Sequence, residues 1–198
     1  MILSRKFYER DTVKVAKDLV GKKIIRVNKN TIYSGIIIET EAYRASDDAA
    51  SHATNKITKR NHAMFETVGK SYVYFTYGMY NCLNVVARSK KFSAGAVLIR
   101  GIYPTDSIKK MEKNRKTNKF SNLANGPGKL TQAFEITTKD YGIDMTKKSD
   151  LYITTGINPK KINIKPRIGI LKAADKKWNF SINPKAVSYT HLTLPTKA

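Results

Sequence analysis

The chain has 198 residues, enough for one domain with a substantial core, and a hydrophobic share of 41% excludes a chain that is disordered throughout. The charge is unusual, because 37 Lys and Arg stand against 15 Asp and Glu, for a net charge of +22. Such a field favours a polyanionic partner, nucleic acid first and an anionic membrane second. We expect one basic domain over residues 1–188. Residues 189–198 continue no pattern of that domain and are consistent with a non-native tail.

A single cysteine, Cys82, excludes an internal disulfide and fits a reducing compartment. The first residues lack the apolar core of a signal peptide, and no apolar run reaches membrane-spanning length. We therefore expect a cytoplasmic protein, associated with the nucleoid in a bacterium. Cys82 and the three histidines show no ligand spacing, so no metal is expected.

In chain order, the first elements are a short helix and two strands. The apolar spacing after Asp11 predicts a helix that Asp11 or Thr12 caps and that Gly21 ends. Strands are expected at 22–27 and 31–40, joined by a turn. Residues 44–64 are polar and lack periodicity, which predicts a long loop with helical pieces; loops of this length are more often functional than idle.

The stretch 71–84 predicts a strand, a tight bend at Gly78 and a returning strand, with an aromatic side chain at the tip. The remaining expected elements are a strand at 96–100, helices at 108–115 and 130–134, and late strands at 151–154, 167–171 and 178–182. Helices and strands therefore occur in one mixed domain without an internal repeat.

Two carboxylates follow the apolar run of the second strand. Glu39 and Glu41 are two residues apart, so a strand aims both to the same side. Glu41 is the leading catalytic candidate, because partial removal from water at a strand end beside Tyr43 makes a carboxylate a better base. The alternative is a strand-end salt bridge, which is the favoured interpretation for Glu39. Arg100, at the end of another expected strand, could orient Glu41 or a nearby water.

Several tyrosines surround these positions, and they allow two interpretations. Aromatic residues on strands are usually core or cross-strand pairs, which we expect for Tyr72. A nucleobase, however, stacks on flat amphipathic walls such as tyrosine rings. Tyr77, immediately before Gly78, fits a wedge that enters a base stack. An RNA-recognition motif competes for this stretch, but the basic and glycine residues of 69–75 stand in the wrong order.

An ordered set of segments resembles the 3-methyladenine (alkyladenine) DNA glycosylase family, whose members are monofunctional base-excision enzymes. The resemblance spans about residues 4–188, in order and with fitting spacing. The segments that carry it are 38–43 (Ile-Glu-Thr-Glu-Ala-Tyr), Asp48 with 51–52, 58–61 with 64–65, 72–84, 97–100, 125–130 and 166–170.

The resemblance implies an α+β domain around a curved, mainly antiparallel sheet, with a protruding hairpin that enters the DNA minor groove. Position by position, Tyr77 would fill the gap left by a flipped nucleotide. The extruded base would lie between three rings, those of Tyr43, His52 and Tyr74. Asn84 would line the floor of the pocket and discourage the exocyclic amine of normal guanine.

For the reaction, the resemblance implies that Glu41 activates the attacking water and that Arg100 helps to position it, with no metal or organic cofactor. The expected partner is double-stranded DNA that contains damaged purines, bound by a monomer. A non-catalytic basic DNA- or RNA-binding protein is the alternative. An anionic-membrane binder ranks third, because no basic amphipathic helix of sufficient length occurs.

The chain departs from the family pattern at three places. Ala45 stands where the family usually has glycine, and residues 66–69 replace a more usual Gly-x-Pro-Gly. Asn179 follows Trp178 where arginine is common. None of these changes removes an expected site residue, but they bear on loop shape, DNA affinity and substrate range.

Overall fold

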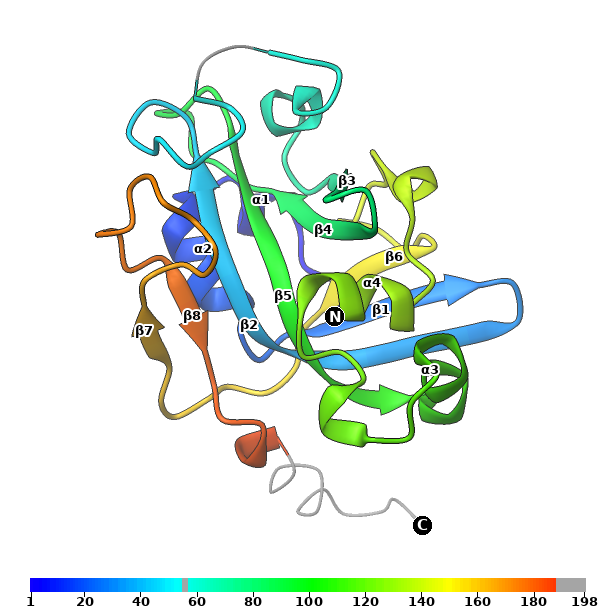
Figure 1. Cartoon of the computed structure of the whole chain (residues 1–198). Coiled ribbons are helices and arrows are strands. Elements are labelled where there is room, and N and C mark those ends of the chain that lie inside the picture. Colours follow the sequence, from blue (N-terminus) through cyan, green and yellow to red (C-terminus); the bar gives the residue numbers. More distant parts are fainter. Residues whose placement is uncertain (55–56, 188–198) are drawn as a thin grey trace.

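A curved antiparallel sheet forms the centre of the computed structural model, which describes residues 1–54 and 57–187 (Figure 1). The strand order is β3-β4-β5-β2-β1-β6; β8 also pairs with β2, and β7 with β8. Every pairing is antiparallel, which confirms the predicted fold class. The strands are β1 (Lys23–Asn28), β2 (Thr31–Arg44), β3 (Ser71–Thr76), β4 (Tyr80–Val86), β5 (Gly95–Asp106), β6 (Leu151–Thr154), β7 (Asn163–Lys165) and β8 (Asn179–Ser181).

The helices are short and lie around the sheet (Figure 1). They are α1 (Arg5–Tyr8), α2 (Thr12–Leu19), α3 (Ile108–Arg115) and α4 (Pro127–Ala133), with 3-10 turns η1 (His62–Phe65), η2 (Phe120–Asn122) and η3 (Thr138–Asp140). The predicted cap of α2 is confirmed, because the Asp11 carboxylate accepts from the backbone N–H groups of Val13 and Lys14. The buried face of α2 includes Val15 and Leu19.

The long strands β2 and β5 pair along most of their length, with irregular register near the carboxylates. Glu39 pairs with Gly101 and Thr40 with Ile99, so Arg100 is an extra residue between two paired positions. Such a bulge turns a side chain to a new direction. The prediction that Glu41 and Arg100 end their strands is wrong. Pairing continues to Arg44 on β2, and β5 runs on well past Arg100.

The strand predicted at 167–171 is also wrong, because this segment is irregular. Gly169 has a φ of 74°, in the left-handed region that favours glycine. The backbone N–H of Ile168 donates to the side chain of Glu41 instead of to a neighbouring strand. β8 follows at Asn179–Ser181, within the last predicted strand.

The loop after β2 is fixed by a buried ion pair. Both side chains of Arg167 and Asp48 are fully buried, and the guanidinium makes two 2.7 Å hydrogen bonds to the carboxylate. Asp48 also accepts from the backbone N–H groups of Arg44 and Ala50. The loop therefore lies against the segment before β8, as the cyan and orange parts of Figure 1 show. A helical piece was predicted in this loop, and η1 begins there, at His62.

The sequence also predicts a non-native tail at 189–198 and no membrane-spanning run. The tail at 189–198 lies outside the described residues. Within 1–54 and 57–187, no helix combines the length and the hydropathy that crossing a bilayer requires.

The Asp48–Arg167 pair gives a stability prediction. Asp48→Asn should lower the free energy of unfolding by about 3 kcal/mol, because it leaves the Arg167 charge buried without its partner. Asp47→Asn is the matched control: Asp47 is 41% exposed beside Arg44, so its loss should cost less than about 1 kcal/mol. Urea unfolding of both variants checks this, and equal losses would contradict a fixing role for Asp48.

Candidate active site

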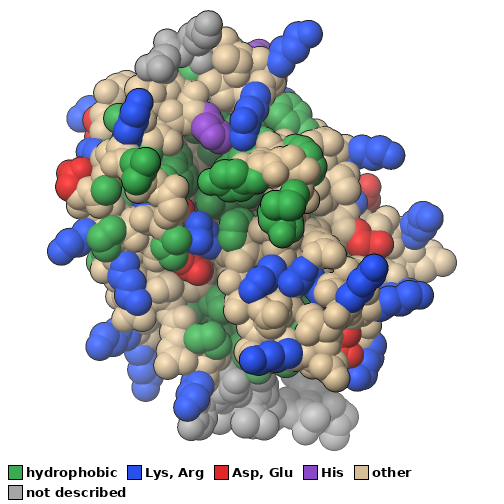
Figure 2. Space-filling view, in the orientation of Figure 1, with side chains coloured by type: hydrophobic (Ala, Val, Ile, Leu, Met, Phe, Trp, Pro, Cys, Tyr) green, Lys and Arg blue, Asp and Glu red, His purple; other side chains and the backbone are tan. Residues whose placement is uncertain are grey.

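A cavity of about 220 Å³ opens between the β3–β4 hairpin and the irregular segment before β8. Figure 2 shows this face of the molecule hollowed, with hydrophobic side chains around the hollow and Lys and Arg side chains beyond them. Residues from several separate parts of the chain line the cavity, and those used below are Tyr43, His52, Tyr74, Tyr77, Cys82, Asn84, Arg100 and Ile168.

Glu39 and Glu41 project to the same side of β2, as predicted. The Arg100 guanidinium donates to both, at 3.2 Å to Glu39 Oε1 and 3.3 Å to Glu41 Oε2. The bulge at Arg100 places this side chain beside the two carboxylates. The predicted proximity of Arg100 to Glu41 is therefore present.

The two oxygens of Glu41 have different surroundings. Oε2 accepts from the Tyr43 hydroxyl at 2.8 Å and from Arg100. Oε1 accepts from the Ile168 N–H at 2.7 Å and from the Asn179 amide at 3.1 Å. Tyr43, Arg100 and Ile168 line the cavity, whereas Asn179 lies on β8. Both donors to Oε2 are therefore cavity-lining side chains, whereas Oε1 is held by a backbone N–H at the edge of the cavity and by the amide of β8.

Glu41 is more deeply buried than its sequence suggests. We expected partial removal from water, but its exposure is 0% and its side chain does not line the cavity. β8 and the segment at Ile168 cover the carboxylate, and the side chains of Tyr43 and Arg100 stand between it and the open space. Any water that reaches Oε2 must come from the cavity side.

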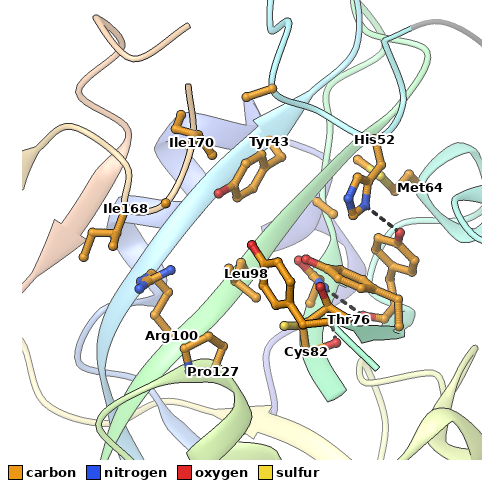
Figure 3. Close-up of a pocket in the computed structure, with 17 residues that line it drawn as sticks. Tyr43, His52, Met64, Thr76, Cys82, Leu98, Arg100, Pro127, Ile168 and Ile170 are labelled. Carbon is orange, nitrogen blue, oxygen red and sulfur yellow. Dashed lines mark hydrogen bonds between the residues drawn. The ribbon is translucent and has the colours of Figure 1, made fainter. Parts of the chain in front are cut away.

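Three aromatic rings cluster on the hairpin side of the cavity. The rings of His52 and Tyr74 meet edge to face at 4.8 Å between centroids, and Tyr72 and Tyr74 lie 5.2 Å apart. His52 Nδ1 is 3.0 Å from the Tyr72 hydroxyl. Figure 3 shows Tyr43 across the cavity from His52. The structure therefore brings Tyr43, His52 and Tyr74 around one space.

Cations lie against two of these rings. The Arg167 guanidinium is 4.7 Å from the centroid of the Tyr43 ring, and that of Arg60 is 4.9 Å from the Tyr74 ring. Arg167 is the same residue that pairs with Asp48, so the loop anchor also holds one wall of the cavity. This double role was not predicted from the sequence.

Burial shifts the ionisation of the cavity walls. Burial, followed by the Glu41 charge, raises the pKa of Tyr43, so its hydroxyl stays a hydrogen-bond donor. Burial likewise raises the pKa of Tyr74 and of the Cys82 thiol. Burial and then the Arg60 charge lower the pKa of His52. These four side chains are therefore uncharged at neutral pH, and Arg100 is the cation among the cavity residues named above.

The cavity lining includes Asn84, a polar side chain with a fixed orientation. Asn84 is 3% exposed and donates from Nδ2 to the Tyr72 carbonyl at 3.0 Å. Since both residues belong to the paired strands β3 and β4, the hairpin itself sets this orientation. Cys82 is buried, as its apolar surroundings suggested, but it also lines the cavity.

The predicted hairpin is present and carries Tyr77 at its tip. Tyr77 and Gly78 have φ values of 52° and 63°, and Met79 N–H donates to the Thr76 carbonyl, as in a type I′ turn. A tyrosine in the left-handed region is unusual, which is a form of local strain. The Tyr77 side chain is 82% exposed, and Met79 beside it is exposed too. An apolar tip is thus held out into solvent.

Sequence reasoning missed the two donors to Glu41 Oε1. Asn179 was noted only as a departure from a family pattern, and the Ile168 N–H carries no side-chain signal. Asp48 and Arg167 both lie in segments that carry the family resemblance, but nothing in the sequence indicated that they pair with each other. Across 1–54 and 57–187, no group of three or more His, Cys, Asp or Glu could hold a metal ion.

A cavity walled by tyrosines beside a buried carboxylate, in a basic domain, fits the class of enzymes that act on a single extruded base. The family model of methylpurine-DNA glycosylase (MPG) matches residues 6–186. The chain belongs to this family of DNA glycosylases, which confirms the resemblance seen in the sequence.

Relatives of similar length carry a matching name. A protein of Prosthecochloris aestuarii is 44% identical over 98% of this chain and 94% of its own length, and it is named "Putative 3-methyladenine DNA glycosylase". Proteins of Clostridium novyi and Ehrlichia chaffeensis bear the same name. Each is 44% identical over 91% of this chain, and 94% and 93% of their own lengths are covered.

The environment of His52 gives a titration prediction. Because the Arg60 charge contributes to the lowered pKa of His52, Arg60→Gln should raise that pKa, whereas Arg60→Lys should leave it nearly unchanged. NMR titration of the His52 ring checks this. If the His52 pKa of Arg60→Gln equals that of the wild type, burial alone lowers the pKa of His52.

Proposed function

We propose that this protein hydrolyses the N-glycosidic bond of alkylated or deaminated purines in double-stranded DNA and leaves an abasic site. The observation that carries the proposal is the placement of Glu41. Its carboxylate is fully buried, and the two donors to Oε2, Tyr43 and Arg100, both line the cavity. A carboxylate directly behind Tyr43 and Arg100 would supply negative charge next to a base in the cavity.

The cavity supports recognition of an extruded base. Unstacking a base costs a few kcal/mol, and least for a damaged pair, so damaged bases enter such a cavity preferentially. Alkylation at a ring nitrogen makes the purine cationic, and the electron-rich faces of Tyr43 and Tyr74 attract a cation. Asn84, which lines the cavity, would contact the polar edge of the purine and disfavour the exocyclic amine of normal guanine.

Hydrolysis needs a water between Glu41 and the sugar. The Arg100 contact with Oε2 is 3.3 Å, the longest of the four hydrogen bonds to Glu41, so a small movement of Arg100 admits a water there. The water oxygen would attack the anomeric carbon, and its proton would pass to Glu41. The base leaves with the electron pair of the broken bond, and the carboxylate stabilises the cationic sugar.

The surface supports binding to duplex DNA. The net charge of +22 attracts the phosphate backbone, and binding should weaken steeply with salt as counterions are released. Tyr77 at the exposed tip would enter the minor groove and occupy the space of the flipped nucleotide, as a monomer on the duplex.

A non-catalytic basic DNA- or RNA-binding protein is the competing function. Such a protein would explain the charge and the exposed rings. It would not need a carboxylate buried with four donors beside the cavity, because burial of a charge is costly. Release of bases from alkylated duplex DNA separates the two functions.

The role of Glu41 is tested by Glu41→Gln. The variant should bind DNA normally but lose at least about 10²-fold in single-turnover excision, because the amide cannot accept the proton of the water. Glu112→Gln, which removes only a carboxylate paired with an exposed lysine on α3, should retain full excision. Near-normal excision by Glu41→Gln would remove this residue from the role.

The role of the hairpin tip is tested by Tyr77→Ala. Loss of the wedge should reduce the fluorescence change of 2-aminopurine placed beside a lesion, because the flipped state is less populated. Ile32→Ala removes an exposed apolar side chain from the β1–β2 hairpin and should leave the signal unchanged. An unaltered signal in the Tyr77 variant would count against insertion.

A further inference from the structure

Asn179 lies between the two carboxylates of β2. Its amide Nδ2 is 2.7 Å from Glu39 Oε1 and 3.1 Å from Glu41 Oε1, and the residue is 2% exposed. The position follows from strand pairing, because β8 places Asn179 opposite Glu41. Only the amide nitrogen can face two carboxylates favourably, since the amide oxygen would be repelled.

Arg100 bridges the same two carboxylates from β5. Glu39 and Glu41 therefore share one guanidinium and one amide, and with both acids ionised this cluster of four side chains has a net charge of −1. Two neighbouring carboxylates repel each other, and donors shared between them offset that repulsion. Arg100 and Asn179 are those donors.

We propose that Asn179, together with Glu39, is a positioning residue that holds Glu41 with Oε2 turned toward the cavity. This inference rests on the proposed glycosylase function. Asn179 and the Ile168 N–H hold Oε1, and Glu39 Oε1 accepts from the same Asn179 amide nitrogen and so fixes its position. Asn179 is not part of the cavity lining and acts only through Glu41.

A neutral donor at this position suits the chemistry. Asn179 satisfies Oε1 without adding positive charge, so Arg100 is the cation shared by the two acids. The cluster keeps a net negative charge with which to stabilise a cationic sugar.

The groups that face Glu41 come from every element packed against it. They are Glu39 and Tyr43 on β2, Arg100 on β5, Asn179 on β8 and the backbone N–H of Ile168. A third carboxylate at 179 would meet two others and one cation. Such a cluster would take up a proton more readily than the native one.

The test compares Asn179→Leu and Asn179→Asp in single-turnover excision from duplex DNA that contains a methylated purine, between pH 5.5 and 8. Asn179→Leu lacks the donor and should excise about 10-fold more slowly at every pH, with DNA binding unchanged. Asn179→Asp should be slow at pH 8 and should recover relative to the wild type as pH falls, because a proton on the cluster restores a donor.

Phe180→Leu is the matched control, because Phe180 belongs to the same strand and packs in the core. It should lower the melting temperature and leave the excision rate of the folded enzyme unchanged. An Asn179→Asp profile parallel to that of the wild type would overturn the inference. If Asn179→Leu does not fold, the pH profile of Asn179→Asp still tests whether Asn179 positions Glu41. Wild-type protein that releases no base would instead refute the proposed function.

Discussion

The structure depends on the burial of one carboxylate. A charge removed from water costs several kcal/mol unless donors replace the water, and Glu41 receives four. The four donors come from β2, from β5 and from the stretch 168–179 that includes the start of β8, and these three parts lie far apart in the sequence. Satisfying Glu41 therefore requires that these parts of the chain come together in one arrangement.

The same arrangement produces the cavity. Tyr43 and Arg100 hold Oε2 and form part of the wall, so the residues that stabilise the buried acid also place it next to the space for a base. Arg167 extends this coupling, because it pairs with Asp48 in the loop and lies on the Tyr43 ring. The hairpin supplies the opposite wall and its exposed tip, and its strand register sets Asn84. The contacts that stabilise the fold thus also set the geometry of the site.

Much of this could be predicted from local patterns. A spacing of two residues placed Glu39 and Glu41 on one side, and the aromatic run with Gly78 predicted the hairpin. Strand ends were less accurate, because Arg44 and the residues after Arg100 look polar or irregular in sequence but pair within the sheet. The apolar alternation at 167–171 is typical of a strand, yet Arg167 and the Ile168 N–H bind side chains of distant residues instead. The full burial of Glu41 could not be predicted, since Ile168 and Asn179, which cover it, follow more than 100 residues later.

The central claim is that water, directed by Glu41, cleaves the glycosidic bond. The most direct measurement is base release from methylated duplex DNA in H₂¹⁸O, with borohydride added to trap any covalent enzyme–DNA intermediate. The account predicts a free methylated purine, one ¹⁸O atom in the abasic sugar and no trapped complex. A trapped complex would show that an amine of the protein attacks the sugar, and the absence of released base would show that the protein only binds DNA.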